Sequence, residues 1–135
     1  MSLLKWQQKY AVGVKALDHH RNIFIEILNE LHAASMKGQA KQAVGSLFRK
    51  LKDYAREYHS AEERLLEAAK FPALIQHRDR HCEFAEKLTE FERRHEEGDN
   101  TVYVEMLRFL RNWLDDHMLD EDQHYRPLLS EREMA

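Results

Sequence analysis

The sequence predicts an all-α protein, and three observations carry that prediction. The 135 residues include only four Gly and two Pro, too few for the turns of a sheet protein. Residues that favour helices, such as Ala, Leu, Glu, Lys and Arg, are abundant. Apolar residues recur at spacings of three and four between breaks at Gly38, Phe71-Pro72 and Gly98-Asp99-Asn100. Because the connections are short, sequential helices should be antiparallel, as in an up-down-up-down four-helix bundle.

Four helices are expected between these breaks, and the chain is predicted to be a single domain, 1–135. The helices should span about Leu17–Lys37, Lys41–Lys70, Ala73–Glu96 and Thr101–Leu119. Residues 1–16 precede the bundle of residues 17–119, and their apolar content indicates an extended arm that packs along it. Residues 120–135 form a C-terminal segment.

The first two helices each carry a polar side chain on an apolar stripe. Leu17, Phe24, Ile27 and Leu31 define the first stripe, and His20 lies on that face. The second stripe consists of Val44, Leu47, Leu51, Tyr54, Leu65 and Ala69, with Tyr58 and Glu62 at its missing steps. The neighbouring His59 is placed on the shoulder of this stripe.

The last two helices repeat the pattern. His77 and His81 fill the interval between Leu74 and Phe84, so the two imidazoles should lie one above the other. In the last helix an apolar stripe ends at His117, and Asp122 follows five residues later, within reach of the same interior level.

The buried carboxylates predict a metal centre. Burying Glu62 and Asp122 as ions costs several kcal/mol each unless a cation or strong donors compensate them. The periodicity places no Lys or Arg on the inward stripes near these levels, which favours metal ions. Carboxylates from different helices commonly bridge two irons or manganeses in bundles, whereas the absence of Cys from the stripes disfavours structural zinc.

Charge and hydropathy limit the other classes of function. Basic and acidic residues number 21 and 24 and are interspersed, giving a net charge of -3, which argues against a nucleic-acid partner. The sequence shows neither a bilayer-spanning apolar run nor a secretory leader, which predicts a cytoplasmic protein with no membrane partner. The single cysteine, Cys82, agrees with a reducing compartment and is expected to be partly buried.

Several motifs occur together along the chain. They are Trp6 with Val12-Gly13-Val14; Asp18-His19-His20-Arg21-Asn22-Ile23-Phe24; Glu62-Glu63-Arg64-Leu65-Leu66 leading through Phe71-Pro72 to His77-x3-His81; and Trp113-Leu114-x2-His117-x4-Asp122. With these motifs the sequence resembles the hemerythrins, in particular the single-domain bacterial hemerythrins, over nearly its whole length.

The resemblance implies a non-haem di-iron centre with two iron ions, oxo- or hydroxo-bridged. Glu62 and Asp122 would bridge the irons. His77, His81 and His117 would be the remaining ligands of the first iron. The second iron would have His20, and in this family it takes one further His and binds dioxygen at an open position. The implied ligand positions in this sequence are His20, Tyr58, Glu62, His77, His81, His117 and Asp122.

Tyr58 stands where the family has that further His, which leaves several arrangements open. A coordinated phenolate favours ferric iron and opposes reversible oxygen carriage. If Tyr58 only packs nearby, water, His59 or Glu57 could fill the vacancy. A pair shifted by one residue, His59 with Glu63, keeps the i, i+4 spacing but leaves the apolar face unless a π turn absorbs the extra residue.

Three functions follow from these arrangements. The leading hypothesis is a non-enzymatic di-iron protein that binds, stores or senses dioxygen or a related small molecule. A second is a di-iron oxidase or peroxide-consuming enzyme in which Tyr58 supplies an electron. A third is a structural four-helix module that holds little metal.

Overall fold

The structure, a computed structural model, describes residues 4–128. Predictions for residues 1–3 of the arm and 129–135 of the C-terminal segment therefore fall outside the described residues. Within the described range the chain is helical and contains no strand, which confirms the all-α prediction. No helix in this part of the chain is long and apolar enough to cross a bilayer.

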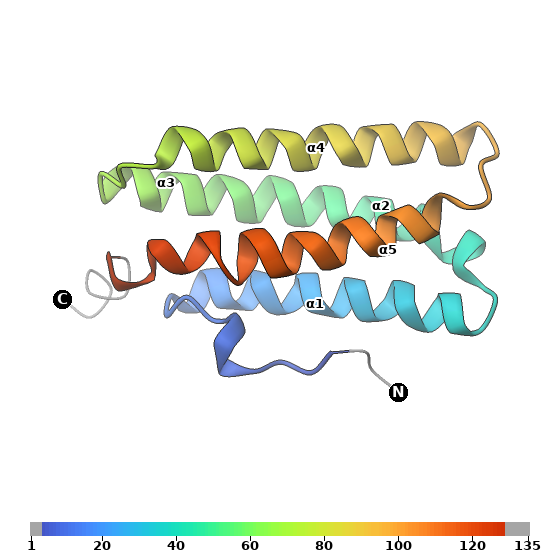
Figure 1. Cartoon of the computed structure of the whole chain (residues 1–135), viewed down its shortest axis with the longest axis horizontal. Helices are drawn as coiled ribbons and strands as arrows, with labels where there is room; N and C mark the ends of the chain where they lie inside the picture. The colour runs from blue at the N-terminus through green and yellow to red at the C-terminus, as the bar shows by residue number, and fades with distance from the viewer. Residues whose placement is uncertain (1–3, 129–135) are drawn as a thin grey trace.

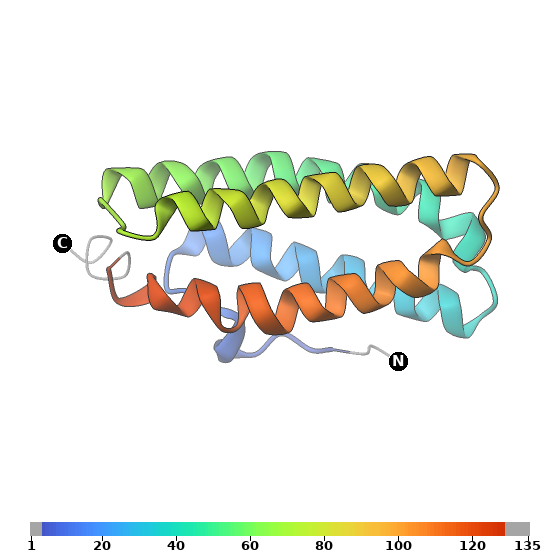
Figure 2. The same ribbon diagram turned by 45° about the horizontal axis from the view of Figure 1, so that its top comes forward.

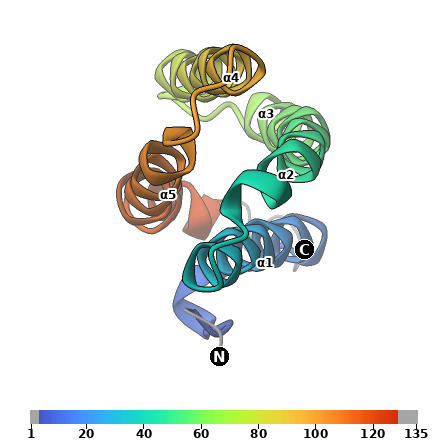
Figure 3. The ribbon, with the colours of Figure 1, turned by 90° about the vertical axis from the view of Figure 1, so that its right-hand side faces the viewer.

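The helices pack into four columns, and neighbouring columns run antiparallel (Figure 1). Their bounds are Lys15–Met36 (α1); Ala40–Tyr54 (α2), a π turn at Ala55–His59 and Ser60–Ala68 (α3); Leu74–Glu96 (α4); and Val102–Trp113 (α5), followed by a second π turn at Leu114–Met118. A short 3-10 helix, Glu121–His124, comes after the fourth column. Seen end-on, α1 and α4 occupy opposite corners, and the α2–α3 column and α5 lie between them (Figure 3).

The helices end close to the predicted breaks because the local chemistry stops them there. Gly38 and Gly98 follow α1 and α4 with φ of +69° and +93°, a left-handed conformation that glycine adopts without steric cost. Each turn then reverses the chain into the next column.

The N-terminal segment lies against the outside of the bundle (Figure 2). Tyr10 and Val12 are buried, and the Asp18 carboxylate accepts hydrogen bonds from the backbone N–H groups of Val12 (2.7 Å) and Gly13 (3.2 Å). The Asn29 side chain exchanges two hydrogen bonds with the backbone of Leu4. These polar contacts fix the direction in which the segment enters α1.

The π turn at Ala55–His59 changes which side chains of the second column face inward. It contains one residue more than an α-helical turn, so Tyr58 and His59 are both buried, at 1% and 7% exposure. The prediction that Leu65 faces the core is wrong: Leu65 is 38% exposed, and Leu66 is buried in its place. Leu66 lies one turn after the buried Glu62, which follows from the rotated register.

Candidate metal centre

Four predicted ligands converge inside the bundle. They are Glu62 from α3, His77 and His81 from α4, and His117 from the second π turn. One ligand atom from each lies within 4.8 Å of the others, and all four residues are buried. Glu62 Oε1 is 2.5 Å from His77 Nε2 and 2.9 Å from His81 Nε2. The i, i+4 spacing in α4 aligns the two imidazoles along one face, as the sequence predicts.

Asp122 adds a fifth oxygen donor to this group. It lies in the 3-10 helix beyond the fourth column, and its Oδ1 is 3.3 Å from His77 Nε2 and 3.2 Å from His117 Nε2. Two ligands that bind one metal at right angles, each about 2.1 Å from it, are separated by roughly 3 Å. The separations around Asp122 Oδ1 are of this size.

Unpaired polar atoms show that the group fits a metal ion. His81 Nε2, His117 Nε2 and Asp122 Oδ1 are buried and make no well-aligned hydrogen bond within residues 4–128, although they lie close to one another's neighbours in the cluster. Such atoms normally find a partner because an unsatisfied buried polar group is costly. Burial lowers the pKa of His117 to about 2, so its imidazole stays neutral and keeps a lone pair. Three imidazole nitrogens with carboxylate oxygens form a donor set that suits iron.

Glu63 orients one of the imidazoles from outside this group. Its Oε2 lies 2.6 Å from His81 Nδ1, which positions a carboxylate to accept the Nδ1–H hydrogen bond. The proton is then held on Nδ1, and Nε2 presents its lone pair to the cluster. The sequence suggests Glu63 only as part of a shifted ligand pair, and helical spacing gives no signal for this supporting role.

The other oxygens of both carboxylates face a different set of groups. Glu62 Oε2 accepts hydrogen bonds from the hydroxyls of Tyr58 (2.8 Å) and Tyr125. Asp122 Oδ2 accepts from Nη1 of Arg21 at 2.6 Å. Tyr58 therefore contacts the cluster as a hydrogen-bond donor to a carboxylate.

Arg21 overturns the prediction that the inward stripes hold no Lys or Arg. Its side chain is fully buried and pairs with Asp122. The spacing could have revealed it, because Arg21 is four residues after Leu17 and three before Phe24. His20 also fits the same two buried residues, at three and four, so periodicity alone did not distinguish them. Tyr125 was missed because it follows the last helix, where there is no periodic stripe to read.

The structure does not bring His20 into the cluster. Its Nδ1 lies 2.9 Å from the Ala16 carbonyl oxygen, its Nε2 is 3.5 Å from Glu57, and its side chain is 22% exposed. The ring packs edge-on against Tyr58, with the centroids 6.1 Å apart. Glu57 is 60% exposed and also stays outside the cluster.

His59 is buried beside the cluster and stacks on His81. The two rings are parallel within 1°, with centroids 3.8 Å apart. Imidazole lone pairs lie in the ring plane, so two stacked rings cannot direct them at one ion. Burial lowers the pKa of His59 to about 3, which keeps it neutral. The sequence placed His59 on the shoulder unless a π turn intervened, and a π turn is present.

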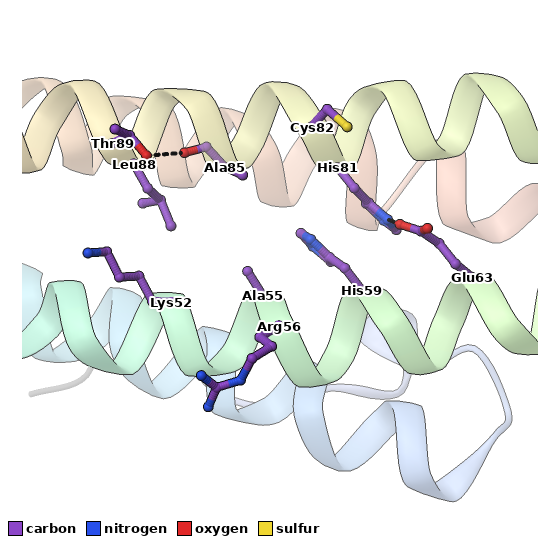
Figure 4. Close-up of a pocket in the computed structure, with 10 residues that line it drawn as sticks. All are labelled: Lys52, Ala55, Arg56, His59, Glu63, His81, Cys82, Ala85, Leu88 and Thr89. Atoms are coloured by element: carbon purple, nitrogen blue, oxygen red, sulfur yellow. Dashed lines mark hydrogen bonds and ion pairs between the residues drawn. The ribbon is translucent and has the colours of Figure 1, made fainter.

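A pocket of about 380 Å³ reaches these two histidines from the surface between the α2–α3 column and α4 (Figure 4). Its walls include His59, His81 and Glu63, with Leu88 at the far end. Cys82 lines its edge and is exposed, which corrects the expectation of a partly buried thiol. The side chain projects outward because it follows the inward-facing His81 by one residue.

A four-helix bundle with a buried cluster of histidines and carboxylates is a metal-binding bundle protein. The sequence profile of the Hemerythrin HHE cation binding domain matches residues 12–129, and the chain belongs to this family. It is similar to the bacteriohemerythrin of Pseudomonas aeruginosa, with 28% identity over 93% of this chain and 80% of that protein. It is 29% identical to the bacteriohemerythrin of Clostridium acetobutylicum, covering 89% of this chain and 96% of the relative.

Solved structures show the same fold. A crystal structure of a hemerythrin point mutant superimposes with a TM-score of 0.84 and covers 96% of this chain and 99% of that one. The sequence identity is 22%, so this likeness concerns the arrangement of the helices.

Proposed function

We propose that this chain binds non-haem iron through His77, His81, His117, Glu62 and Asp122, and that the bound iron interacts with dioxygen or a related small molecule. The observation that carries the proposal is the convergence of buried nitrogen and oxygen atoms, several of which make no well-aligned hydrogen bond within the described residues. Iron bound there would supply a redox-active Lewis acid. The protein would serve as a binder, store or sensor of the small ligand.

Access to the cluster supports a small ligand. His81 belongs to the cluster and also lines the pocket beside α4, so that wall of the site is reached from the surface. The name bacteriohemerythrin borne by several relatives supports the same class of ligand.

Iron loading under anaerobic conditions tests this function. The purified chain is saturated with ferrous iron, bound iron is measured per chain, and absorption spectra are compared before and after dioxygen is admitted. At least about one iron per chain and an oxygen-dependent spectral change are expected. His77→Ala should lose iron, whereas His19→Ala, a change of an exposed imidazole, should keep it. If the iron-loaded protein shows the same absorption spectrum before and after dioxygen is admitted, the dioxygen proposal is wrong.

A second candidate function is reductant-dependent consumption of dioxygen or peroxide. The observation that favours it is the hydrogen bond from the Tyr58 hydroxyl to Glu62, a carboxylate whose other oxygen faces the histidines. An oxidisable phenol in that position could deliver an electron to the centre. Tyr58→Phe should then slow consumption of the oxidant by the iron-loaded protein, and an unchanged rate would count against this role.

A further inference from the structure

Each of the two buried carboxylates points one oxygen at the histidines and the other at hydroxyl or guanidinium donors. On one side, Glu62 Oε1 and Asp122 Oδ1 each lie 2.5–3.3 Å from imidazole nitrogens. On the other side, Glu62 Oε2 accepts from two tyrosine hydroxyls and Asp122 Oδ2 accepts from Arg21. The carboxylates therefore bridge between the histidine cluster and a second position, and that second position is filled by side chains of this chain.

The Arg21 guanidinium holds this second position with every nitrogen engaged. Nη1 donates to Asp122 Oδ2 at 2.6 Å and to the Tyr58 hydroxyl at 2.9 Å. Nε donates to the carbonyl oxygen of Tyr10, and Nη2 donates to that of Met118. The side chain is fully buried and linked to the N-terminal segment, the second column and the end of the fourth. A group fixed from three directions does not leave without disrupting the fold.

The charges in the site also disfavour a second ion. The Glu62 and Asp122 carboxylates and the Arg21 guanidinium have a summed charge of -1. One divalent ion among the histidines brings this sum to +1. The imidazoles add nothing, because a histidine binds a metal ion through a neutral ring. A second divalent ion would raise the total to +3 in a buried site and would lie beside the guanidinium, where like charges repel strongly.

We propose that this chain binds a single metal ion, and that Arg21 and Tyr58 permanently occupy the place a second metal would take. This inference rests on the proposed function, because it specifies the composition of the same site. The two-iron expectation from the sequence does not fit the residues present: His20 lies outside the cluster, and Arg21 supplies positive charge without a coordinating lone pair. One iron changes its charge by one electron between the ferrous and ferric states, whereas a pair can change by two.

Counting metal in the unmodified protein tests this proposal. The chain is saturated with ferrous iron under anaerobic conditions, unbound iron is removed, and iron is measured against protein concentration. One iron per chain is expected. After oxidation the sample should give the EPR signal of an isolated high-spin ferric ion, because a coupled ferric pair is silent. Two irons per chain with a silent spectrum would overturn this inference and leave the proposed function standing, whereas no bound iron would overturn both.

A variant that restores ligands to the second position gives the converse result. Arg21→His combined with Tyr58→His replaces a fixed charge and a phenol by two neutral imidazoles, so the count should rise twofold. His20→Ala is the matched control and should leave one iron per chain. A double variant that keeps its helical circular dichroism but still binds one iron would overturn the role given to Arg21. The count in the unmodified chain decides the proposal if the variant fails to fold.

Discussion

Replacing Arg21 with methionine should destabilise the metal-free protein strongly. The guanidinium is fully buried, and it neutralises Asp122 while donating to two backbone carbonyls and a tyrosine hydroxyl. Methionine has a similar length and fills much of the space, but it donates no hydrogen bond. The substitution therefore leaves a carboxylate and several acceptors buried without their partner.

The size of the effect follows from this burial. Removing one member of a buried ion pair typically costs about 3–5 kcal/mol, and a domain of this size has about 5–15 kcal/mol of stability in all. The loss is limited because Asp122 can take up a proton. Burial and the neighbouring Glu62 already raise the pKa of this carboxyl against the lowering effect of Arg21, and removing the guanidinium raises the pKa further.

The pH dependence gives the prediction a sign. A carboxyl whose folded-state pKa lies above its unfolded value takes up protons more readily in the folded protein, so stability falls as pH rises through this interval. The loss in free energy of unfolding caused by Arg21→Met should therefore be larger at pH 7.5 than at pH 5.5. Adding Asp122→Asn removes the orphaned charge and should recover part of the loss at the higher pH.

Urea denaturation in the presence of a chelator, followed by circular dichroism, measures these free energies of unfolding. Arg93→Met is the matched control, because Arg93 is 60% exposed and pairs with Glu97 on the surface of α4; it should cost less than about 1 kcal/mol. If Arg21→Met and Arg93→Met unfold at the same urea concentration at pH 7.5, the inference that Arg21 neutralises a buried carboxylate is refuted.

Three further predictions concern the metal, the arm and the π turn. Ferrous iron at 100 times its dissociation constant should stabilise the chain by about 2.7 kcal/mol and raise its melting temperature by roughly 10 °C; a midpoint that ignores chelator would favour the metal-poor structural module. Asp18→Ala removes the acceptor for two backbone N–H groups of the arm and should cost about 1–2 kcal/mol in urea denaturation, against almost nothing for the exposed Asp53→Ala; equal losses would contradict this. Leu66→Ala should cost about 2–5 kcal/mol and Leu65→Ala less than about 1, and the reverse order would mean the second column has no π turn.

The sequence predicted the helical columns well, and it placed several of the buried polar side chains on the correct inward face. The breaks at Gly38 and Gly98 and the apolar spacing give the helices to within a turn, because these signals are local. His77 and His81 share one helix face, so their convergence inside the bundle follows from spacing alone. Glu62 and His117 were placed inward correctly because each continues an apolar stripe.

The predictions for the side of the site near Arg21 and for the second column were wrong for two physical reasons. His20 and Arg21 both fit the helical period, and only packing against Tyr10, Tyr58 and Asp122 decides that the guanidinium is the buried one. The π turn adds a residue to the second column, so His59 is buried beside Tyr58, and Leu66 is buried in place of Leu65.

The sequence by itself determined the fold class, the family motifs and the group of histidines and carboxylates that converge inside the bundle. These depend on periodicity and turn chemistry, which act between residues a few positions apart. Only the tertiary structure decided what stands at the second position, because that depends on contacts between Arg21 and residues as far away as Asp122. A buried charge selects its partner in space, and helical spacing leaves that choice open.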